Sequence, residues 1–306
     1  MRSCSQDLLD GLIGDDQKRC QLQEFIASPD VFASNKFGIE SLCEALSLPY
    51  EKGDKQVNLM SKHLGNNIIT IVDYGAGKGR LLEGLSEDYK YLLARLDYYA
   101  FDPSDKDAEI CKRNMYDNKI PLTNYTNHMD DLLEILPNNG TDAVLLVNVL
   151  HEIEPKYWSE VFTNIQKLLK PNGILILVES EILSQGEKAY DNGFLVMTEE
   201  ALKTLLSTTE IQVKREKIAL GSIVSYTIGK EHLCGVNDSS VATSIQNIAK
   251  NSLEHIKEIK SLKIDPAKDE TVLWKEGLCL AFWTHQYANA QLNNSFIQNQ
   301  STLQSE

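Results

Sequence analysis

Apolar residues along the chain follow two different patterns. In residues 8–26 and 39–46 they recur every three or four positions, which is typical of amphipathic helices, and Pro49 ends the second run. From residue 67 to about 230, short and nearly continuous apolar runs alternate with helical patterns, and beyond residue 231 helical spacing returns. We therefore expect a central strand–helix domain between two helical segments.

Strands and helices alternate in the central zone. The runs at 141–150 and 174–180 are almost wholly apolar, as strands buried on both faces of a sheet require. The last two strands, on either side of Gly221, are expected to pair antiparallel. Ser104 is expected to cap one intervening helix, and Gly173 to follow the end of another. The pattern predicts an α/β fold with a doubly wound, mostly parallel sheet and a C-terminal antiparallel hairpin, flanked by N- and C-terminal helical segments.

The predicted domain boundaries follow these changes of pattern. Residues 1–66 are expected to form a helical cap, 67–230 the central domain, 231–290 a helical appendage and 291–306 a flexible tail rich in Asn, Gln and Ser. Aromatic residues gather at 282–287, where helical spacing favours core packing over a place in a substrate pocket.

Three alternating glycines follow the first strand of the central zone, in the stretch TIVDYGAGKGR at 70–80. Glycine lets a chain turn sharply and lets a ligand approach the backbone. A dinucleotide fingerprint, G-x-G-x-x-G, would need a third glycine where Arg80 stands, which argues against an NAD-dependent dehydrogenase. No phosphate-binding P-loop motif is present. The acid Asp73, two residues before the first glycine, suits a ligand that carries an ammonium group.

The segment Asp73 to Gly79 resembles the first motif, D-x-G-x-G-x-G, of class I S-adenosylmethionine-dependent methyltransferases. Four further segments resemble later elements of that family in the same order: YYAFDPSD, NHMDDL, DAVLLVNVLHEI and LLKPNGILILVE. The resemblance covers about residues 67–230, and implies a methyltransferase domain with S-adenosylmethionine as the cofactor.

The resemblance also implies which residues bind that cofactor. Asp102, followed by Pro103, would hold the ribose hydroxyls, although an acid here could instead cap the next helix. Met129 and Asp130 would contact the adenine, and Asp130 could equally be a helix N-cap. Asn148 would face the sulfonium or the acceptor, unless its amide only satisfies backbone groups. The expected cofactor-binding residues are Asp73, Gly75, Ala76, Gly77, Gly79, Asp102, Pro103, Met129, Asp130 and Asn148.

His151 is the candidate catalytic residue, because it follows the apolar strand at 141–150. A histidine near its ordinary pKa is a ready base for a hydroxyl or amine, and some methyltransferases that resemble this chain use one here. The alternative is that His151 only orders the loop. Glu152 could assist it, or could be one of the acids that precede the helix beginning at Pro155.

The net charge and the composition indicate which class of methyl acceptor is favoured. The formal net charge is −14, which would repel a phosphate backbone, and no run of Lys or Arg is dense enough to offset it. Nucleic acid is therefore expected to be an unlikely partner, and a small-molecule or protein acceptor is favoured. The six histidines are dispersed, so no metal site is expected. A homodimer is left open.

Cysteine usage and hydropathy bear on location. Six cysteines stand without C-x-x-C pairs, as expected for reduced thiols in a cytoplasmic protein. The N-terminus does not resemble a signal peptide, and no apolar segment has the length of a membrane span, so no membrane contact is expected.

Two hypotheses about function result. The first is an S-adenosylmethionine-dependent methyltransferase that transfers the methyl group directly to oxygen or nitrogen, with His151 as general base. The alternative is a non-catalytic module that binds S-adenosylmethionine or a nucleotide and works through a protein partner.

Overall fold

A computed structural model describes most of the chain beyond its first 53 residues. The described residues are 54–137, 140–183, 195–218, 221–263 and 270–303, without the side chains of 270–275 and 295–303. The chain divides into two compact units, residues 1–49 with 183–189 and residues 50–182 with 190–306. Only Leu183 of the first unit is described, so the architecture below is that of the second. Most of the predicted N-terminal cap lies outside the described residues.

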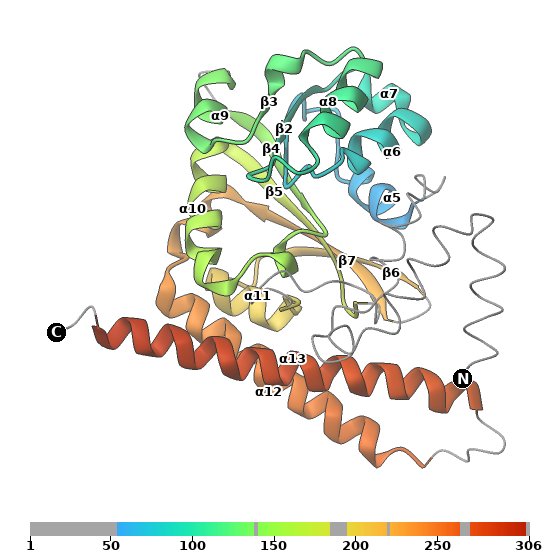
Figure 1. Cartoon of the computed structure of the whole chain (residues 1–306), viewed down its shortest axis with the longest axis vertical. Coiled ribbons are helices and arrows are strands. Elements are labelled where there is room, and N and C mark those ends of the chain that lie inside the picture. Colours follow the sequence, from blue (N-terminus) through green and yellow to red (C-terminus); the bar gives the residue numbers. More distant parts are fainter. Residues whose placement is uncertain (1–53, 138–139, 184–194, 219–220, 264–269, 304–306) are drawn as a thin grey trace. The chain divides into compact units, whose positions relative to one another are not determined.

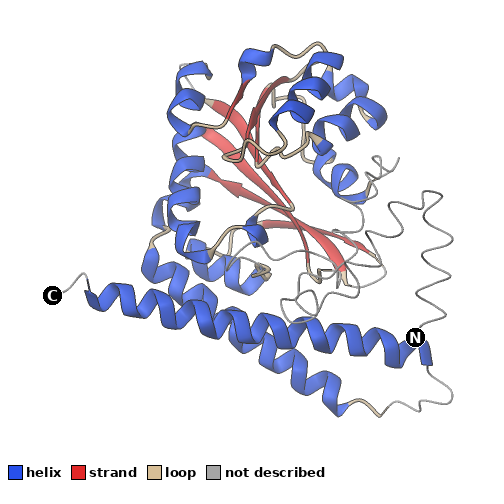
Figure 2. Ribbon diagram, in the orientation of Figure 1, coloured by secondary structure: helices blue, strands red, loops and turns tan. Residues whose placement is uncertain are grey.

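One seven-stranded sheet forms the centre of this unit, with strand order β3-β2-β1-β4-β5-β7-β6 (Figure 2). The strands are β1 (Thr70–Tyr74), β2 (Asp97–Phe101), β3 (Tyr125–Thr126), β4 (Thr141–Val147), β5 (Leu169–Ser180), β6 (Gln212–Lys217) and β7 (Ser222–Gly229). The first five run parallel, while β7 is antiparallel to both β5 and β6. The predicted doubly wound sheet with a C-terminal hairpin is confirmed. Its order reverses between β1 and β4, where ligands of such sheets bind.

Helices cover both faces of the sheet (Figure 1). The α-helices are α5 (Lys55–Ser61), α6 (Arg80–Asp88), α7 (Lys90–Leu93), α8 (Ala108–Asp117), α9 (Met129–Ile135), α10 (Trp158–Leu168), α11 (Glu199–Leu206), α12 (Asp238–Ser261) and α13 (Glu270–Leu303). Short 3-10 helices span Leu122–Asn124, Leu150–Glu152, Pro155–Tyr157 and Lys230–Gly235. None of the helices in the described ranges combines the length and the apolar character that a membrane crossing requires.

The apolar run of β4 is explained by two separate cores. Side chains alternate between the faces of a strand, so a strand covered on both sides needs apolar residues at every position. Leu146 of β4 joins Trp158 in the core under α9, α10 and α11, which α12 extends. Leu145 joins Leu82 in the core under α5, α6 and α8. Both strand residues are fully buried.

The C-terminal helices pack through the aromatic cluster. Phe282 and Trp283 are buried, and Trp283 stacks on His255 of α12 with ring centroids 4.2 Å apart. Gln286 is fully buried, and its Oε1 accepts a hydrogen bond of 2.9 Å from the Val196 backbone N–H. The expected core packing is confirmed for Phe282 and Trp283. Helix α13 continues to Leu303, into the segment expected to be a tail.

Two predicted helix ends are wrong. Ser104 does not cap α8, whose N-cap is Asp107; the Ser104 hydroxyl instead accepts from the Lys106 N–H in the turn before the helix. Helix α10 ends at Leu168, because the next residue pairs with Thr141 of β4. Gly173 consequently lies inside β5.

Candidate active site

The loop after β1 is formed by three glycines with positive φ. The angles are +85° at Gly75, +49° at Gly77 and +80° at Gly79. A residue with a side chain would adopt such a φ only with backbone strain. A Cβ at Gly75 would stand 2.6 Å from Cγ1 of Val149, so packing against the β4 exit requires that glycine. A Cβ at Gly77 would meet nothing within 4 Å. Gly77 therefore borders open space from which a ligand can reach the backbone.

Asp102 joins this glycine loop to the end of β2. Its Oδ2 accepts a hydrogen bond of 2.7 Å from the Gly77 N–H, and its Oδ1 accepts one of 2.8 Å from the Ser104 N–H. Burial raises the pKa of the Asp102 carboxyl above its ordinary value. Each carboxylate oxygen retains a further lone pair, so Asp102 can also accept from hydroxyl groups of a ligand. Pro103 is exposed.

The glycine loop is also fixed through its own backbone. The N–H groups of Gly75 and Ala76 both donate to the carbonyl oxygen of Phe101, at 2.8 and 3.0 Å. Ala76 is buried, and Gly79 is the N-cap of α6 in the left-handed conformation. The loop therefore has a set shape before any ligand binds.

Asp73 lies at the end of β1 and is almost enclosed. The residue is 3% exposed, and the Tyr98 hydroxyl donates to its Oδ2 at 2.5 Å. Burial raises the pKa of the Asp73 carboxyl to about 7, and the negative charge of Asp102 acts in the same direction. The carboxyl thus packs against a neighbouring strand, and its predicted contact with a ligand's ammonium group stays a prediction.

The backbone is strained where β4 ends. Asn148 has a φ of +58°, which is uncommon for a residue with a side chain and is frequent at functional sites. Its N–H donates to the Val178 carbonyl at 2.7 Å, and its Oδ1 accepts from Nε2 of Gln56, on α5, at 3.1 Å. The side chain of Asn148 is thereby held at the carboxyl edge of the sheet.

Immediately after this point, His151 and Glu179 form a buried pair. His151 is 1% exposed and Glu179 is 2% exposed. Nδ1 of His151 lies 2.6 Å from Oε2 of Glu179, and because a carboxylate only accepts, Nδ1 carries the proton. Oε1 of Glu179 accepts from the Leu150 N–H at 2.8 Å. Glu152 is half-buried in the same 3-10 helix, and its N–H donates to the Val149 carbonyl.

Met129 and Asp130 lie in the first turn of α9. Met129 is half-buried and packs against the core, whereas Asp130 is exposed. The N-cap of α9 is His128, so the alternative in which Asp130 is the cap is wrong. An adenine contact for these residues stays a prediction.

Sequence reasoning missed three residues of this region: Glu179, Gln56 and Tyr98. The signal for Glu179 was present, since an acid ends an otherwise apolar strand at the edge where His151 was expected. Gln56 and Tyr98 reach their partners, Asn148 and Asp73, only through the tertiary fold.

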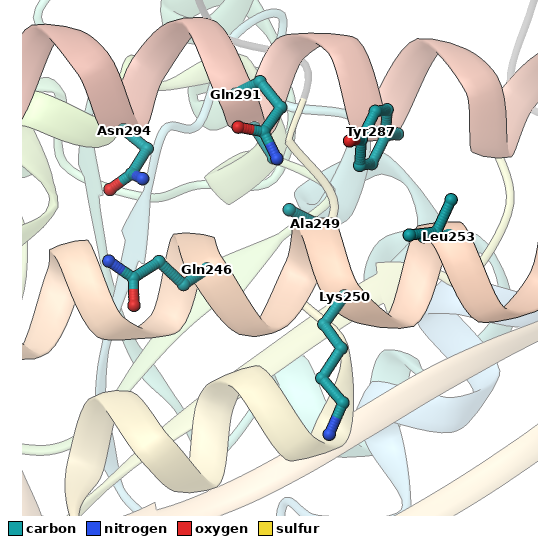
Figure 3. A pocket seen from close by; sticks show the side chains of 8 residues that line it. Gln246, Ala249, Lys250, Leu253, Tyr287, Gln291 and Asn294 are labelled. Atoms are coloured by element: carbon teal, nitrogen blue, oxygen red, sulfur yellow. The ribbon is translucent and has the colours of Figure 1, made fainter.

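A separate hollow of about 260 Å³ lies between α12 and α13 (Figure 3). Its lining residues are Gln246, Ala249, Lys250, Leu253, Tyr287, Ala290, Gln291 and Asn294. None of them belongs to the loops at the carboxyl edge of the sheet. Across the part of the chain that the structure describes, no group of three or more His, Cys, Asp or Glu side chains could hold a metal ion.

Comparison with known proteins identifies the region that contains the glycine loop. Residues 72–175 match the family described as methyltransferase domain. The tRNA N(3)-cytidine methyltransferase of Homo sapiens is 35% identical over 107 residues, which cover 34% of this chain and 36% of that protein. The tRNA N(3)-methylcytidine methyltransferase of Schizosaccharomyces pombe is 27% identical over 109 residues, 35% of each chain. The matched region spans about a third of the length of these relatives.

Solved structures give a more distant likeness. The mitomycin 7-O-methyltransferase has 16% sequence identity and a TM-score of 0.42, over 57% of this chain and 52% of that chain. The family match over residues 72–175 confirms the predicted resemblance to methyltransferases, and it agrees with S-adenosylmethionine as the predicted cofactor.

The prediction about nucleic acid is wrong. The sequence relatives are named as tRNA methyltransferases, whereas the net charge of −14 led to nucleic acid being expected as an unlikely partner. Net charge is a sum over the whole chain, and exposed charges more than about 10 Å apart are largely screened from one another at 0.1 M salt. A local surface can therefore attract phosphate while the total is negative.

The raised pKa of Asp73 predicts how stability depends on pH. Its folded-state pKa of about 7 lies above the ordinary value, so the folded protein holds this proton more tightly and loses stability as pH rises towards 7. Between pH 5 and 8, the free energy of unfolding should fall by about 3 kcal/mol more in the wild type than in Asp73→Asn. Urea unfolding at several pH values measures this, with the exposed Asp97→Asn as control. If the free energy of unfolding of Asp73→Asn fell as steeply with pH as that of the wild type, the prediction would be contradicted.

Proposed function

We propose that the chain, whose residues 72–175 match the methyltransferase domain family, is an S-adenosylmethionine-dependent methyltransferase whose acceptor is RNA. The observation that carries the cofactor assignment is the hydrogen bond from the Gly77 N–H to the Asp102 carboxylate beside open space. As part of the proposal, residues 67–230 are the cofactor-binding domain, between the helical segments at 1–66 and 231–290.

The residues at the carboxyl edge fit this cofactor. Asp102 would accept from the vicinal ribose hydroxyls, because both of its oxygens already face the loops that would enclose the ribose. The backbone at Gly77 would contact the amino-acid portion, and Met129 and Asp130 would contact the adenine. When bound, S-adenosylmethionine supplies a methyl group that its positively charged sulfur has already activated.

The chain's own part in the reaction would be to align the acceptor and exclude water. Asn148 would contact the acceptor or the sulfonium, since its strained backbone holds the side chain at the end of β4. A neutral ring nitrogen, such as N3 of cytosine, has a lone pair and needs no base. We therefore propose that His151 positions the β4 exit through Glu179, and that removing a proton from the acceptor is not its role.

RNA as the acceptor class rests on the sequence relatives, which are named as tRNA N(3)-cytidine methyltransferases. Their match covers about a third of this chain, and the family match at residues 72–175 contains the glycine loop. A cytosine base in tRNA is accordingly the first acceptor to test.

Replacing Asp102 tests the cofactor site and the activity together. Asp102→Ala removes both acceptor oxygens, so affinity for S-adenosylhomocysteine should fall at least about 100-fold, because hydrogen bonds to a charged group contribute about 1.5–3 kcal/mol each. Titration calorimetry measures the binding. Methyl transfer from labelled S-adenosylmethionine to unmodified tRNA should be detectable in the wild type and lost in the variant.

Two controls sharpen this test. Asp105→Ala removes a nearby exposed acid and should leave cofactor affinity unchanged. A thermal melt of Asp102→Ala separates loss of the site from loss of the fold. If the wild-type protein binds no S-adenosylhomocysteine, the proposed function is refuted. Cofactor binding with no methylated RNA would refute the acceptor, and with no product on any acceptor would favour the non-catalytic alternative.

The open space beside Gly77 predicts that a single methyl group blocks the cofactor without unfolding the protein. Gly77→Ala should cost only about 1–2 kcal/mol of stability, the strain of its positive φ, since its Cβ meets nothing in the protein. Cofactor affinity should nevertheless fall more than about tenfold, because the methyl group occupies ligand space. Calorimetry and denaturant unfolding measure the two effects.

Gly221→Ala is the matched control, because Gly221 also has a positive φ, +76°, but lies before β7. It should lose at least as much stability, because its Cβ would also stand 3.3 Å from Cγ1 of Ile182, and it should keep wild-type cofactor affinity. Equal affinities in Gly77→Ala and the wild type would mean that no ligand lies against Gly77.

The roles considered for His151 are separated by two substitutions. Asn at this position can still donate a hydrogen bond to Glu179 from near the place of Nδ1, but it cannot act as a base. If His151 positions the loop, His151→Asn should keep kcat within about tenfold, whereas His151→Ala should lose about 1–3 kcal/mol of stability, because the buried Glu179 carboxylate would keep only its hydrogen bond from the Leu150 N–H. Steady-state kinetics across pH 6–9 measures this. Equal loss of kcat in both variants, with unchanged stability, would identify His151 as the base.

A further inference from the structure

We propose that a patch of three lysines beside the candidate active site binds the phosphate backbone of the RNA acceptor. The lysine patch consists of Lys55 at the start of α5, Lys62 just after its end, and Lys214 on β6. The inference rests on the proposed function and adds the surface that would receive the RNA.

The three lysines surround one acid. Glu216 lies 4.0 Å from Nζ of Lys55 and 3.7 Å from Nζ of Lys62. Nζ of Lys214 donates to the Lys62 carbonyl at 3.4 Å. Three lysines against one glutamate leave a formal charge of +2 on this surface of a chain whose total is −14.

The pleat of β6 explains why these charges gather on one face. Lys214 and Glu216 are two residues apart, so both point to the same side of the sheet. That side is the α5 side, because Lys214 pairs with Ser225, whose hydroxyl lies 2.7 Å from Nε2 of His63, just after α5. His63 adds no charge, because burial, together with Lys214 and Lys62, lowers its pKa to about 4.

The other face of β6 is different. Arg215 points there, where its guanidinium pairs with Glu181 at 3.1 Å and with Glu199. Glu199 also pairs with Lys203, so two carboxylates balance two cations here, and both carboxylates hold the Arg215 guanidinium. Phosphate binding is therefore assigned to the α5 side alone.

The lysine patch begins at the carboxyl edge of the sheet. Lys55 precedes Gln56, whose amide holds Asn148 at the end of β4. Nζ of Lys55 also donates to the carbonyl of Lys217 at 3.0 Å, and Lys217 pairs with Ser222 at the start of β7. Since β7 begins where β5 ends, an RNA strand lying on the patch could present a base beside Asn148.

The lysines are available to a ligand. The side chains of Lys55 and Lys62 are 48% and 50% exposed, and Lys214 is exposed. Exposed ion pairs contribute only about 0–1 kcal/mol, so Glu216 holds its two lysines weakly. Each phosphate that a lysine neutralises releases counterions, which makes RNA affinity depend on salt.

The test measures RNA affinity with the full chain. The triple variant K55Q, K62Q and K214Q should bind an unmodified tRNA transcript more than about tenfold more weakly in roughly 100 mM salt, and the slope of log affinity against log salt should shrink by about 2. The control is K250Q, K257Q and K260Q on α12, which removes the same charge from exposed positions and should keep the wild-type slope. Filter binding over a salt series measures both.

A single substitution should act in the opposite direction. Glu216→Gln removes the one acid of the patch, so RNA affinity should rise about two- to threefold. Misfolding does not produce a gain of affinity, and binding of S-adenosylhomocysteine at wild-type strength verifies the fold of every variant.

The outcomes separate this inference from the proposed function. One outcome is that the wild type methylates tRNA while the triple variant of the lysine patch keeps the wild-type RNA affinity, salt dependence and KM. That result would overturn the inference that the lysine patch binds RNA, and the proposed function would stand. Equal losses in the patch and control triples would also overturn it, because total charge would then explain binding. Wild-type protein that binds S-adenosylhomocysteine but neither binds nor methylates tRNA would overturn the RNA acceptor and the patch together.

Discussion

The shape of the candidate active site depends on one carboxylate. Asp102 accepts hydrogen bonds from the loop that follows β1 and from the turn that follows β2, so two adjacent strand ends become one rigid edge. The positive φ at Gly77 is tolerated because that residue has no side chain, and the hydrogen bond to Asp102 then fixes its N–H. Asp73, which is buried and accepts a hydrogen bond from the Tyr98 hydroxyl, joins β1 to β2 within the sheet. Without Asp102, the Gly77 N–H would lose its acceptor, while the hydrogen bonds from Gly75 and Ala76 to Phe101 would remain.

Sequence reasoning succeeded where the pattern is local. The apolar runs predicted the strands, and the glycine spacing predicted the turn after β1, because both follow from period and backbone freedom. It failed where a partner is distant in the chain. Glu179 meets His151 across 28 residues, and Gln56 meets Asn148 across 92, and no periodic signal encodes such pairs. The cap of α8 was missed for the opposite reason, since Ser104 forms a local turn with the Lys106 N–H and the helix begins only after Asp107.

The net charge of the chain does not describe how its charges are distributed over the surface. A total of −14 describes the long-range field, and it led to the wrong expectation about nucleic acid. Lys55 and Lys62 stand at the two ends of α5, but Lys214 lies 152 residues from Lys62 in the sequence, so no basic run marks the three, and the position of β6 beside α5 brings them together. The same strand points Arg215 to the opposite face, where Arg215 and Lys203 are balanced by Glu181 and Glu199. The pleat of one edge strand therefore separates a surface with a positive surplus from a neutral one.

Helix α5 links the cofactor side of the site to the acceptor side. Asp54 caps this helix through the Gln56 and Val57 N–H groups and also pairs with Arg80, the first residue of α6. Arg80 stands where a dinucleotide-binding loop would have its third glycine, so the residue that argues against NAD here anchors the flanking helix to the glycine loop. The first turn of α5 then contains both Lys55 of the lysine patch and Gln56, which donates a hydrogen bond to Asn148. Arg80 therefore connects the end of the glycine loop to the helix whose first two residues are Lys55 and Gln56.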